Sequence, residues 1–223
     1  MSYTRFAIYY LPPEGDLADF GAGWLGWDCV AGRDSVRPDV PGLDDVTMTP
    51  RKYGFHGTLK PPFRLADGTD ADGLREAVSQ MAQVCAPARS DALALTALGR
   101  FLALTPVGDT SGIARVAATC VEALDAFRAP PGAAELERRR KARLSERQEA
   151  LLQRWGYPYV MEEFRFHLTL TGRLDVDKID HWSDIARAHM PPLPSPFVMD
   201  EVALVGERQD GRFELVQRYA LAG

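Results

Sequence analysis

The chain has 223 residues, of which 46% are hydrophobic and 26% are charged, and its formal net charge is −5. This length and composition are typical of a globular protein with a substantial core, and the negative charge argues against a general binder of nucleic acid or membrane surfaces. No apolar run reaches the length of a membrane span, no signal peptide is evident, and three scattered cysteines predict neither disulfides nor a structural zinc site, which favours the cytoplasm.

In the first half of the chain, apolar periodicity predicts strands, helices and one hairpin. A strand at 4–11 and a short helix at 17–25 precede a loop, rich in Gly and Pro, that reaches residue 50. A strand at 52–60 is expected to stop at Pro61-Pro62. The other elements expected here are a helix at 70–85, a hairpin of strands at 91–98 and 101–107, and a helix at 112–127.

The second half begins with a long predicted helix at 134–155, and then repeats the order of the first half. Its further elements are a strand at 164–171, a helix at 176–189, and strands at 197–205 and 213–219 around an Asp210-Gly211 turn. Each half thus contains a histidine-bearing strand, a helix and a hairpin. We therefore expect a duplicated, bilobal α+β fold with lobes at 1–130 and 131–223, two antiparallel sheets with outer helices, and a central cleft carrying both histidine strands.

The sequence Phe-His-x-Thr-Leu occurs twice, as FHGTL around His56 and as FHLTL around His167. Because a strand alternates its side chains, each histidine shares a polar face with the following threonine, Thr58 or Thr169, while apolar residues take the other face. One such strand is common in half-exposed sheets, where its histidine is structural. Two strands with the same residues at the same offsets indicate a shared site.

Two opposed imidazoles suit hydrolysis of a phosphodiester. One can take a proton from the attacking water and the other can give a proton to the leaving oxygen, because the ordinary histidine pKa lies near working pH. The two threonine hydroxyls can hold non-bridging phosphate oxygens, and nearby cations can neutralise charge in the transition state. This scheme requires no metal or other cofactor.

The two motifs resemble the paired His-x-Thr/Ser signatures of the two-histidine (2H) phosphoesterase superfamily. The resemblance implies that His56 and His167 are the catalytic pair, that Thr58 and Thr169 hold phosphate, and that catalysis is metal-independent. The stretches KYGFHGTLKPPF and ERQEALLQRWGYPYVMEEFRFHLTLTGRL are similar to a branch of uncharacterised proteins associated with bacterial phosphonate-utilisation operons. That similarity implies a small phosphorylated substrate, such as a ribose cyclic phosphate.

Further candidates for substrate binding surround the motifs. Strand alternation puts three cations, Lys60, Arg165 and Arg173, on the polar faces. Two aromatic residues, Tyr9 and Tyr53, are further candidates to line the cleft, although aromatic residues in strands usually belong to the core. The basic run ELERRRKARLSERQ has acidic partners at i,i+4 and reads most simply as a solvated helix face. The alternative is an arm that contacts an anionic substrate, with Arg143 and Arg147 as the first candidates.

Three other functions remain open on the sequence. The histidines could bind a metal, but hydroxyls and cations surround them where further ligands would be needed. The cleft could belong to a non-catalytic protein that binds a nucleotide or a phosphosugar. It could also process RNA ends that carry a 2′,3′-cyclic phosphate, although the net charge disfavours a long RNA footprint. We expect a monomer that acts on a small phosphorylated molecule and has no membrane partner.

Overall fold

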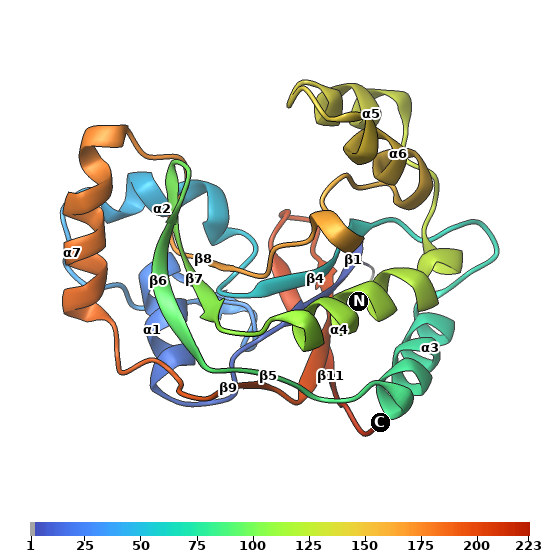
Figure 1. The fold of residues 1–223 in the computed structure, drawn as a ribbon, viewed down its shortest axis with the longest axis horizontal. Helices are drawn as coiled ribbons and strands as arrows, with labels where there is room; N and C mark the ends of the chain where they lie inside the picture. Colours follow the sequence, from blue (N-terminus) through green and yellow to red (C-terminus); the bar gives the residue numbers. More distant parts are fainter. Residues whose placement is uncertain (1–2) are drawn as a thin grey trace.

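Seven apolar or alternating segments pair into one antiparallel sheet in the computed structural model, which describes residues 3–223 (Figure 1). The strand order across this sheet is β11-β10-β1-β4-β8-β7-β6. Its strands are β1 (Phe6–Tyr10), β4 (Gly57–Phe63), β6 (Ala92–Leu98), β7 (Phe101–Val107), β8 (Leu168–Thr169), β10 (Glu201–Glu207) and β11 (Phe213–Ala220). Two small sheets pair β2 (Trp27–Asp28) with β3 (Arg33–Asp34) and β5 (Ala88–Ser90) with β9 (Phe197–Met199).

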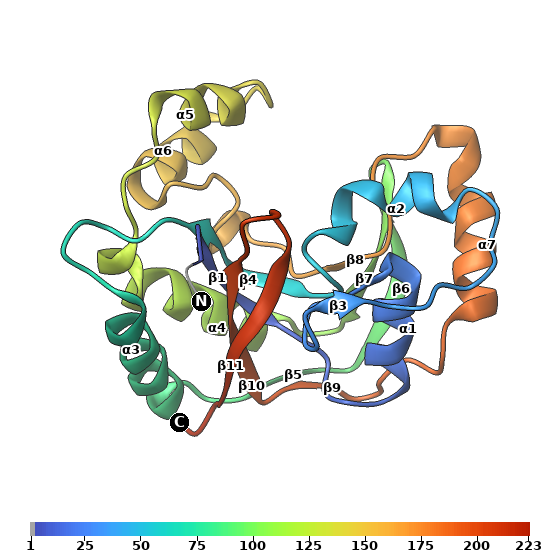
Figure 2. The ribbon, with the colours of Figure 1, turned by 180° about the vertical axis from the view of Figure 1, so that it is seen from behind.

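The helices lie outside the sheet, in two groups and one projecting arm (Figures 1 and 2). Helices α3 and α4 pack near β4, β10 and β11, whereas α7 packs on β6 and β7 and α1 packs on α2. Helices α5 and α6 project from the body as an arm. The helices are α1 (Asp16–Leu25), α2 (Leu43–Arg51), α3 (Ala71–Val84), α4 (Ser111–Ala123), α5 (Ala133–Arg140), α6 (Glu146–Trp155) and α7 (Ile179–His189), with 3-10 turns at Asp125–Phe127, Met161–Glu163 and Val176–Lys178.

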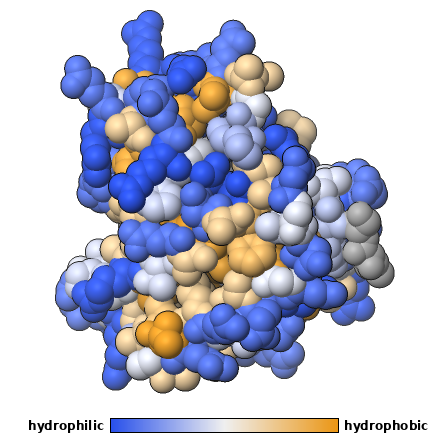
Figure 3. Space-filling view, turned by 90° about the vertical axis from the view of Figure 1, so that its right-hand side faces the viewer, coloured by the Kyte–Doolittle hydropathy of each residue, from blue (hydrophilic) through white to orange (hydrophobic). Residues whose placement is uncertain are grey.

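The core lies on both faces of the sheet around β1. Phe6, Ile8 and Tyr10 belong to the large apolar cluster under the helices, whereas Ala7 and Tyr9 belong to a smaller cluster on the opposite face. All five residues of β1 are therefore buried, which explains why this segment is a nearly continuous apolar run. The surface on the α3 side carries mostly hydrophilic side chains, with apolar ones gathered in patches between them (Figure 3).

The predicted duplication is confirmed in the order of the elements. The series β4-α3-β5-β6-β7 is repeated as β8-α7-β9-β10-β11, and β5 pairs with β9 of the other copy. Each copy's helix packs on the hairpin of the other copy, because α3 contacts β10 and β11 while α7 contacts β6 and β7. The two copies are therefore interleaved.

The α+β class, the antiparallel pairing and the outer helices agree with the sequence prediction, but the sheet is not divided between two lobes. The β10-β11 hairpin lies beside β1, and β8 lies between β4 and β7. Strands from 1–130 and from 131–223 are therefore mixed within one sheet. The predicted boundary near residue 130 does not divide this sheet into two. The two expected sheets are joined where Gly57 on β4 pairs with Leu168 on β8.

Strand β4 continues through Pro61 and Pro62, where the sequence predicted a stop. Proline lacks an N–H and is tolerated in a strand where no ladder hydrogen bond is required of it. That condition holds here, because β8 pairs with β4 only at Gly57, and the pairing with β1 shifts register between Phe6 and Ile8.

The predicted loop that ends at residue 50 contains helix α2, which the sequence reading missed. The helix begins after Gly42, whose φ of 81° is left-handed, and carries Asp44 and Asp45 in its first turn, where carboxylates favour the helix dipole. Its interior is rich in weak helix formers, so burial of Leu43 and Thr47 supplies the stability that propensity does not.

The long predicted helix at 134–155 is instead two helices, α5 and α6, joined by a sharp corner. Arg143 in the corner has a left-handed backbone with φ 54°, which ends any continuous helix. Ser145 then caps α6: its hydroxyl accepts from the backbone N–H of Gln148 at 3.2 Å, and the Gln148 side chain accepts from the Ser145 N–H at 3.1 Å. Among residues 3–223, no helix has the length and apolar character needed to cross a bilayer.

Candidate active site

His56 directly precedes β4, and its ring is fixed at both nitrogens. Its Nδ1 lies 2.9 Å from the carbonyl oxygen of Gly54, and its Nε2 lies 2.9 Å from the hydroxyl oxygen of Thr58. A carbonyl can only accept, so Nδ1 carries the proton and Nε2 accepts a hydrogen bond from Thr58. The sequence prediction that His56 and Thr58 share one face is therefore confirmed.

His167 repeats this arrangement on the other motif. Its Nδ1 donates to the carbonyl oxygen of Arg165 at 2.8 Å, again the residue two positions earlier in the chain. The predicted strand at 164–171 is ladder-paired only at Leu168–Thr169, and the predicted alternation holds over residues 166–170, where the apolar side chains are buried and His167 and Thr169 are partly open. It ends at Thr171, which was predicted on the polar face but is buried. Each imidazole thus presents Nε2 as its reactive nitrogen.

The two motifs meet where β4 and β8 run antiparallel. The pairing of Gly57 with Leu168 sets a register in which His56 lies across from Thr169 and Thr58 lies across from His167. All four side chains lie on one face of the sheet and line one cavity of about 570 Å³. The histidine pair and the threonine pair that the sequence singled out are therefore brought together.

Tyr9 and Tyr53 complete the wall around His56. The Tyr9 ring stacks on His56 with centroids 3.7 Å apart and planes at 23°, and the Tyr53 centroid is 6.1 Å away. Both tyrosines line the cavity, as the sequence suggested. Burial under these rings lowers the pKa of His56 to about 4, with a smaller contribution from the positive charge that His167 would carry. His56 is therefore neutral near pH 7.

This packing gives a testable titration. We expect NMR titration to show one histidine whose pKa is about 4 and whose signal disappears in the His56→Gln variant. Because the folded pKa lies below the unfolded value of about 6.5, the contribution of this group to stability is complete above pH 6.5 and declines as the pH falls toward 4. A His56 signal that titrates near 6.5 would contradict the stacked arrangement.

A second cavity, of about 660 Å³, adjoins the first and shares Tyr53, His56 and Thr169 with it. Its other walls come from the end of α2, the segment that follows β8 and the β6-β7 turn. The turn includes Phe101, whose ring centroid lies 5.6 Å from that of His167. Arg173, a predicted binding residue, lines this cavity rather than the first one.

Lys60 does not reach either of these two cavities, and the prediction that it faces the cleft is wrong. Tyr9 pairs with Thr58 but Ile8 pairs with Lys60, so β4 bulges by one residue and the simple alternation fails beyond that point. The Lys60 ammonium donates instead to the carbonyl oxygen of Val121 at 3.0 Å, and its side chain is 2% exposed. This burial lowers the Lys60 pKa to about 8.

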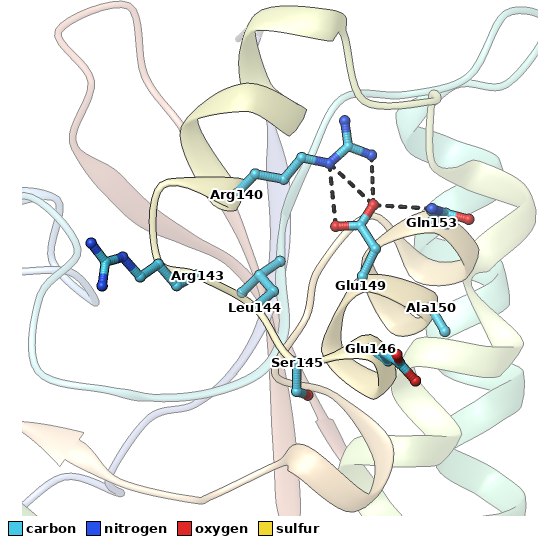
Figure 4. A pocket seen from close by; sticks show the side chains of 8 residues that line it. All are labelled: Arg140, Arg143, Leu144, Ser145, Glu146, Glu149, Ala150 and Gln153. Atoms are coloured by element: carbon cyan, nitrogen blue, oxygen red, sulfur yellow. Dashed lines mark hydrogen bonds and ion pairs between the residues drawn. The ribbon is translucent and has the colours of Figure 1, made fainter.

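Three arginines predicted to bind substrate, Arg165, Arg147 and Arg143, lie in different environments. Arg165 lines the histidine cavity, where its guanidinium donates to backbone carbonyls of Glu162 and Phe164. Arg147 is bound to the carboxylate of Glu162 and does not line the cavity. Arg143 lies in the corner of the arm, where it points away from the Arg140–Glu149 ion pair (Figure 4). The sequence prediction misplaced Arg143 and Arg147 because it assumed one continuous helix, whereas the break between α5 and α6 changes the direction in which later side chains point.

Several cavity residues were not singled out from the sequence as site residues. Arg138 and Arg139 from α5, together with Arg5, Lys52, Tyr157 and Tyr159, line the histidine cavity. Arg138 and Arg139 belong to the basic run, so a signal existed, but their direction depends on how the arm folds back. Within residues 3–223, no three His, Cys, Asp or Glu side chains gather as a metal site would need.

Comparison with known proteins places the chain in a family. Residues 58–214 match the model described as "Protein of unknown function (DUF1045)". The chain belongs to this family. The match begins at Thr58, just after His56, and includes the whole of the second motif. It is consistent with the phosphonate-associated branch that the sequence resembles.

Two curated relatives carry the description "Ribose 1,5-bisphosphate phosphokinase PhnN". The protein from Janthinobacterium sp. (strain Marseille) is 37% identical over 225 residues, which cover 94% of this chain and 49% of the relative. The protein from Laribacter hongkongensis (strain HLHK9) is 37% identical over 189 residues, which cover 83% of this chain and 44% of the relative. The DUF1045 chain spans about half the length of these relatives.

Solved structures give more distant likenesses. TT0787 of Thermus thermophilus has a TM-score of 0.48 and 16% identity, and the alignment covers 98% of each chain. E. coli LigT in its apo form has a TM-score of 0.47 and 14% identity, with both chains covered in full. At these values the likenesses support no inference about the reaction.

Proposed function

We propose that the chain is a phosphoesterase of the 2H type that hydrolyses a small cyclic phosphodiester. The observation that carries this proposal is the cross-strand quartet, in which His56 and His167 lie diagonally across the β4-β8 junction and each has a threonine opposite. The quartet offers two proton-transfer groups and two hydroxyl donors around a single position, which is what displacement at a phosphorus atom needs.

The proton positions support a division of roles between the histidines. Neutral His56 carries its proton on Nδ1, so its Nε2 can accept a proton from the attacking water. The water oxygen forms a bond to phosphorus, and one ester bond of the ring breaks. His167 acts as the general acid and gives a proton from Nε2 to the leaving oxygen, and the product is a phosphomonoester. Thr58 turns from His56 to a non-bridging oxygen when substrate binds.

A ribose cyclic phosphate is the substrate class that we propose. The curated relatives are described as kinases of ribose 1,5-bisphosphate, which supports a ribose phosphate for the family, and a cavity of about 570 Å³ suits a phosphorylated sugar. We also propose that the protein acts as a cytoplasmic monomer without a metal.

The proposal predicts turnover in the presence of a chelator. Ribose 1,2-cyclic phosphate and nucleoside 2′,3′-cyclic phosphates are incubated with the protein in EDTA and followed by ³¹P NMR. We expect the ribose compound to be converted to a phosphomonoester at a rate that EDTA does not change. A ligand that binds in the cavity but stays intact over long incubation would instead support a binding protein, and turnover restored only by added metal would contradict the mechanism.

A further inference from the structure

The histidine cavity holds more positive charge than one cyclic diester can balance. The cations that line it are Arg5, Lys52, Arg138, Arg139 and Arg165, whereas Glu163 is the one carboxylate among its described lining residues. A cyclic phosphodiester carries a single negative charge. The chain as a whole has a net charge of −5, so this concentration of cations is local to the cleft.

The protein's own carboxylates neutralise only part of this charge. Arg5 is paired with Glu207 at 2.5 Å. Arg138 and Arg139 share one carboxylate, Glu135, at the loose distances of 3.8 and 3.6 Å. One carboxylate for two guanidiniums leaves the α5 face of the cavity positive.

Two further cations of the cavity have no carboxylate within ion-pair distance among residues 3–223. Arg165 donates only to backbone carbonyls, and Lys52 lies over the ring of Tyr53, with its Nζ 4.8 Å from the centroid. The pKa of Glu207 is lowered mainly by its hydrogen bond from Arg5 and then by the one from Thr4. The positive charge of Lys52 lowers it further by a smaller amount. These cations are available to an anion that enters the cleft.

Two of the cations, Lys52 and Arg139, each lie against a tyrosine of the cavity wall. Lys52 is in contact with Tyr53, whose ring centroid is in turn 6.1 Å from that of His56. On the arm, the Arg139 guanidinium lies 4.5 Å from the Tyr157 centroid, and its Nε is buried without a hydrogen-bond partner in the described structure. The cations of the cavity thus come from separate segments: Lys52 directly follows α2, Arg138 and Arg139 lie on α5, and Arg165 lies shortly before β8.

We propose that this cavity contains a second anion subsite, formed by Lys52, Arg138, Arg139 and Arg165, which binds a phosphomonoester group on the molecule whose cyclic diester lies between the histidines. The inference rests on the proposed function and narrows its substrate to a sugar cyclic phosphate with a second, dianionic phosphate. Arginine forks and an ammonium suit such a group, because each charged hydrogen bond to phosphate strengthens binding.

An RNA backbone would be the other source of a second phosphate, but the arm does not extend a continuous positive path. Outside the cavity, Arg140 is paired with Glu149 and Arg147 with Glu162, while Arg143 and Arg154 have no carboxylate partner within residues 3–223. A chain of nucleotides that left the cleft along the arm would meet these neutralised pairs. We therefore assign the subsite to a compact sugar phosphate.

The test compares two substrates that differ only in the second phosphate: ribose 1,2-cyclic phosphate with and without a phosphate on its 5-hydroxyl. We expect wild-type protein to prefer the phosphorylated compound by tenfold or more in kcat/KM, mainly through KM. Lys52→Ala and Arg138→Ala should lose most of this preference. Lys141→Ala removes the same charge from the exposed end of α5, does not line the cavity, and should keep the preference.

Equal kcat/KM on the two compounds, or a short RNA with a cyclic end cleaved better than both, would overturn the subsite. If wild-type protein cleaves neither compound, the proposed function fails, and calorimetry then decides the subsite separately. Ribose 5-phosphate should bind to wild-type and to His56→Ala protein, and it should bind at least tenfold more weakly to Lys52→Ala and Arg138→Ala. Absence of ribose 5-phosphate binding to wild-type protein would exclude the subsite.

Discussion

Replacing either His56 or His167 by alanine is expected to lower kcat for cyclic phosphodiester hydrolysis by about 10²- to 10⁴-fold, the usual contribution of a positioned acid or base. Each variant removes one of the two proton-transfer groups at the β4-β8 junction and leaves the apolar faces of both strands intact. Kinetics by ³¹P NMR, together with thermal unfolding monitored by circular dichroism, would measure both effects.

The control for this experiment is another histidine. His181 lies on the exposed face of α7 and lines neither cavity, so His181→Ala should keep wild-type activity. The double variant of His56 and His167 should lose little more than the worse single variant if the two imidazoles act in the same step. Wild-type turnover in either single variant would show that the acid/base assignment is incorrect.

Gly57→Ala is expected to destabilise the fold by about 1–3 kcal/mol, as overpacking of a core does, and to lower activity as well. A Cβ at position 57 would lie 2.3 Å from Cε2 of Phe166, whose ring packs against Tyr10 and Phe197 and has little room to move. Gly57 also forms the pair with Leu168 that sets the relative position of both motifs. Urea unfolding would give the change in the free energy of unfolding.

Two further variants separate overpacking from a general glycine effect. Gly132 precedes α5 with an ordinary negative φ of −71°, and a Cβ there would meet no atom within 4 Å, so Gly132→Ala should be nearly neutral. Adding Phe166→Leu to Gly57→Ala should recover part of the lost stability, because the shorter side chain opens the space that the new methyl group needs. Equal destabilisation by both glycine variants would refute the contact.

The quartet of His56, Thr58, His167 and Thr169 was predictable from the sequence because it depends on local alternation and on a duplicated pattern. His56 and Thr58 are two residues apart on a regular stretch, and the same holds for His167 and Thr169, so period-two counting finds the correct face. The sequence predicted that the two motifs share one site because they resemble each other. A single strand of this kind would not have indicated a site.

The errors arose where a tertiary contact changes the local pattern. Counting failed at Lys60 because one extra residue in β4 opposes β1, and only the pairing of the two strands reveals this bulge. It failed at Arg143 and Arg147 because the corner between α5 and α6 resets the helical phase. The basic run continues through this corner without a glycine or proline to mark it, and Ser145 with Gln148 is a signal visible in the sequence that indicates the new start.

The interleaving of the two copies limits how the cleft can open. In enzymes built from two separate lobes, a hinge lets the lobes swing apart and changes the spacing of groups across the gap. Here both imidazoles are attached to adjacent strands of a single sheet, and each outer helix is bound to the opposite hairpin. The spacing of the two imidazoles is thus set by the pairing of β4 with β8.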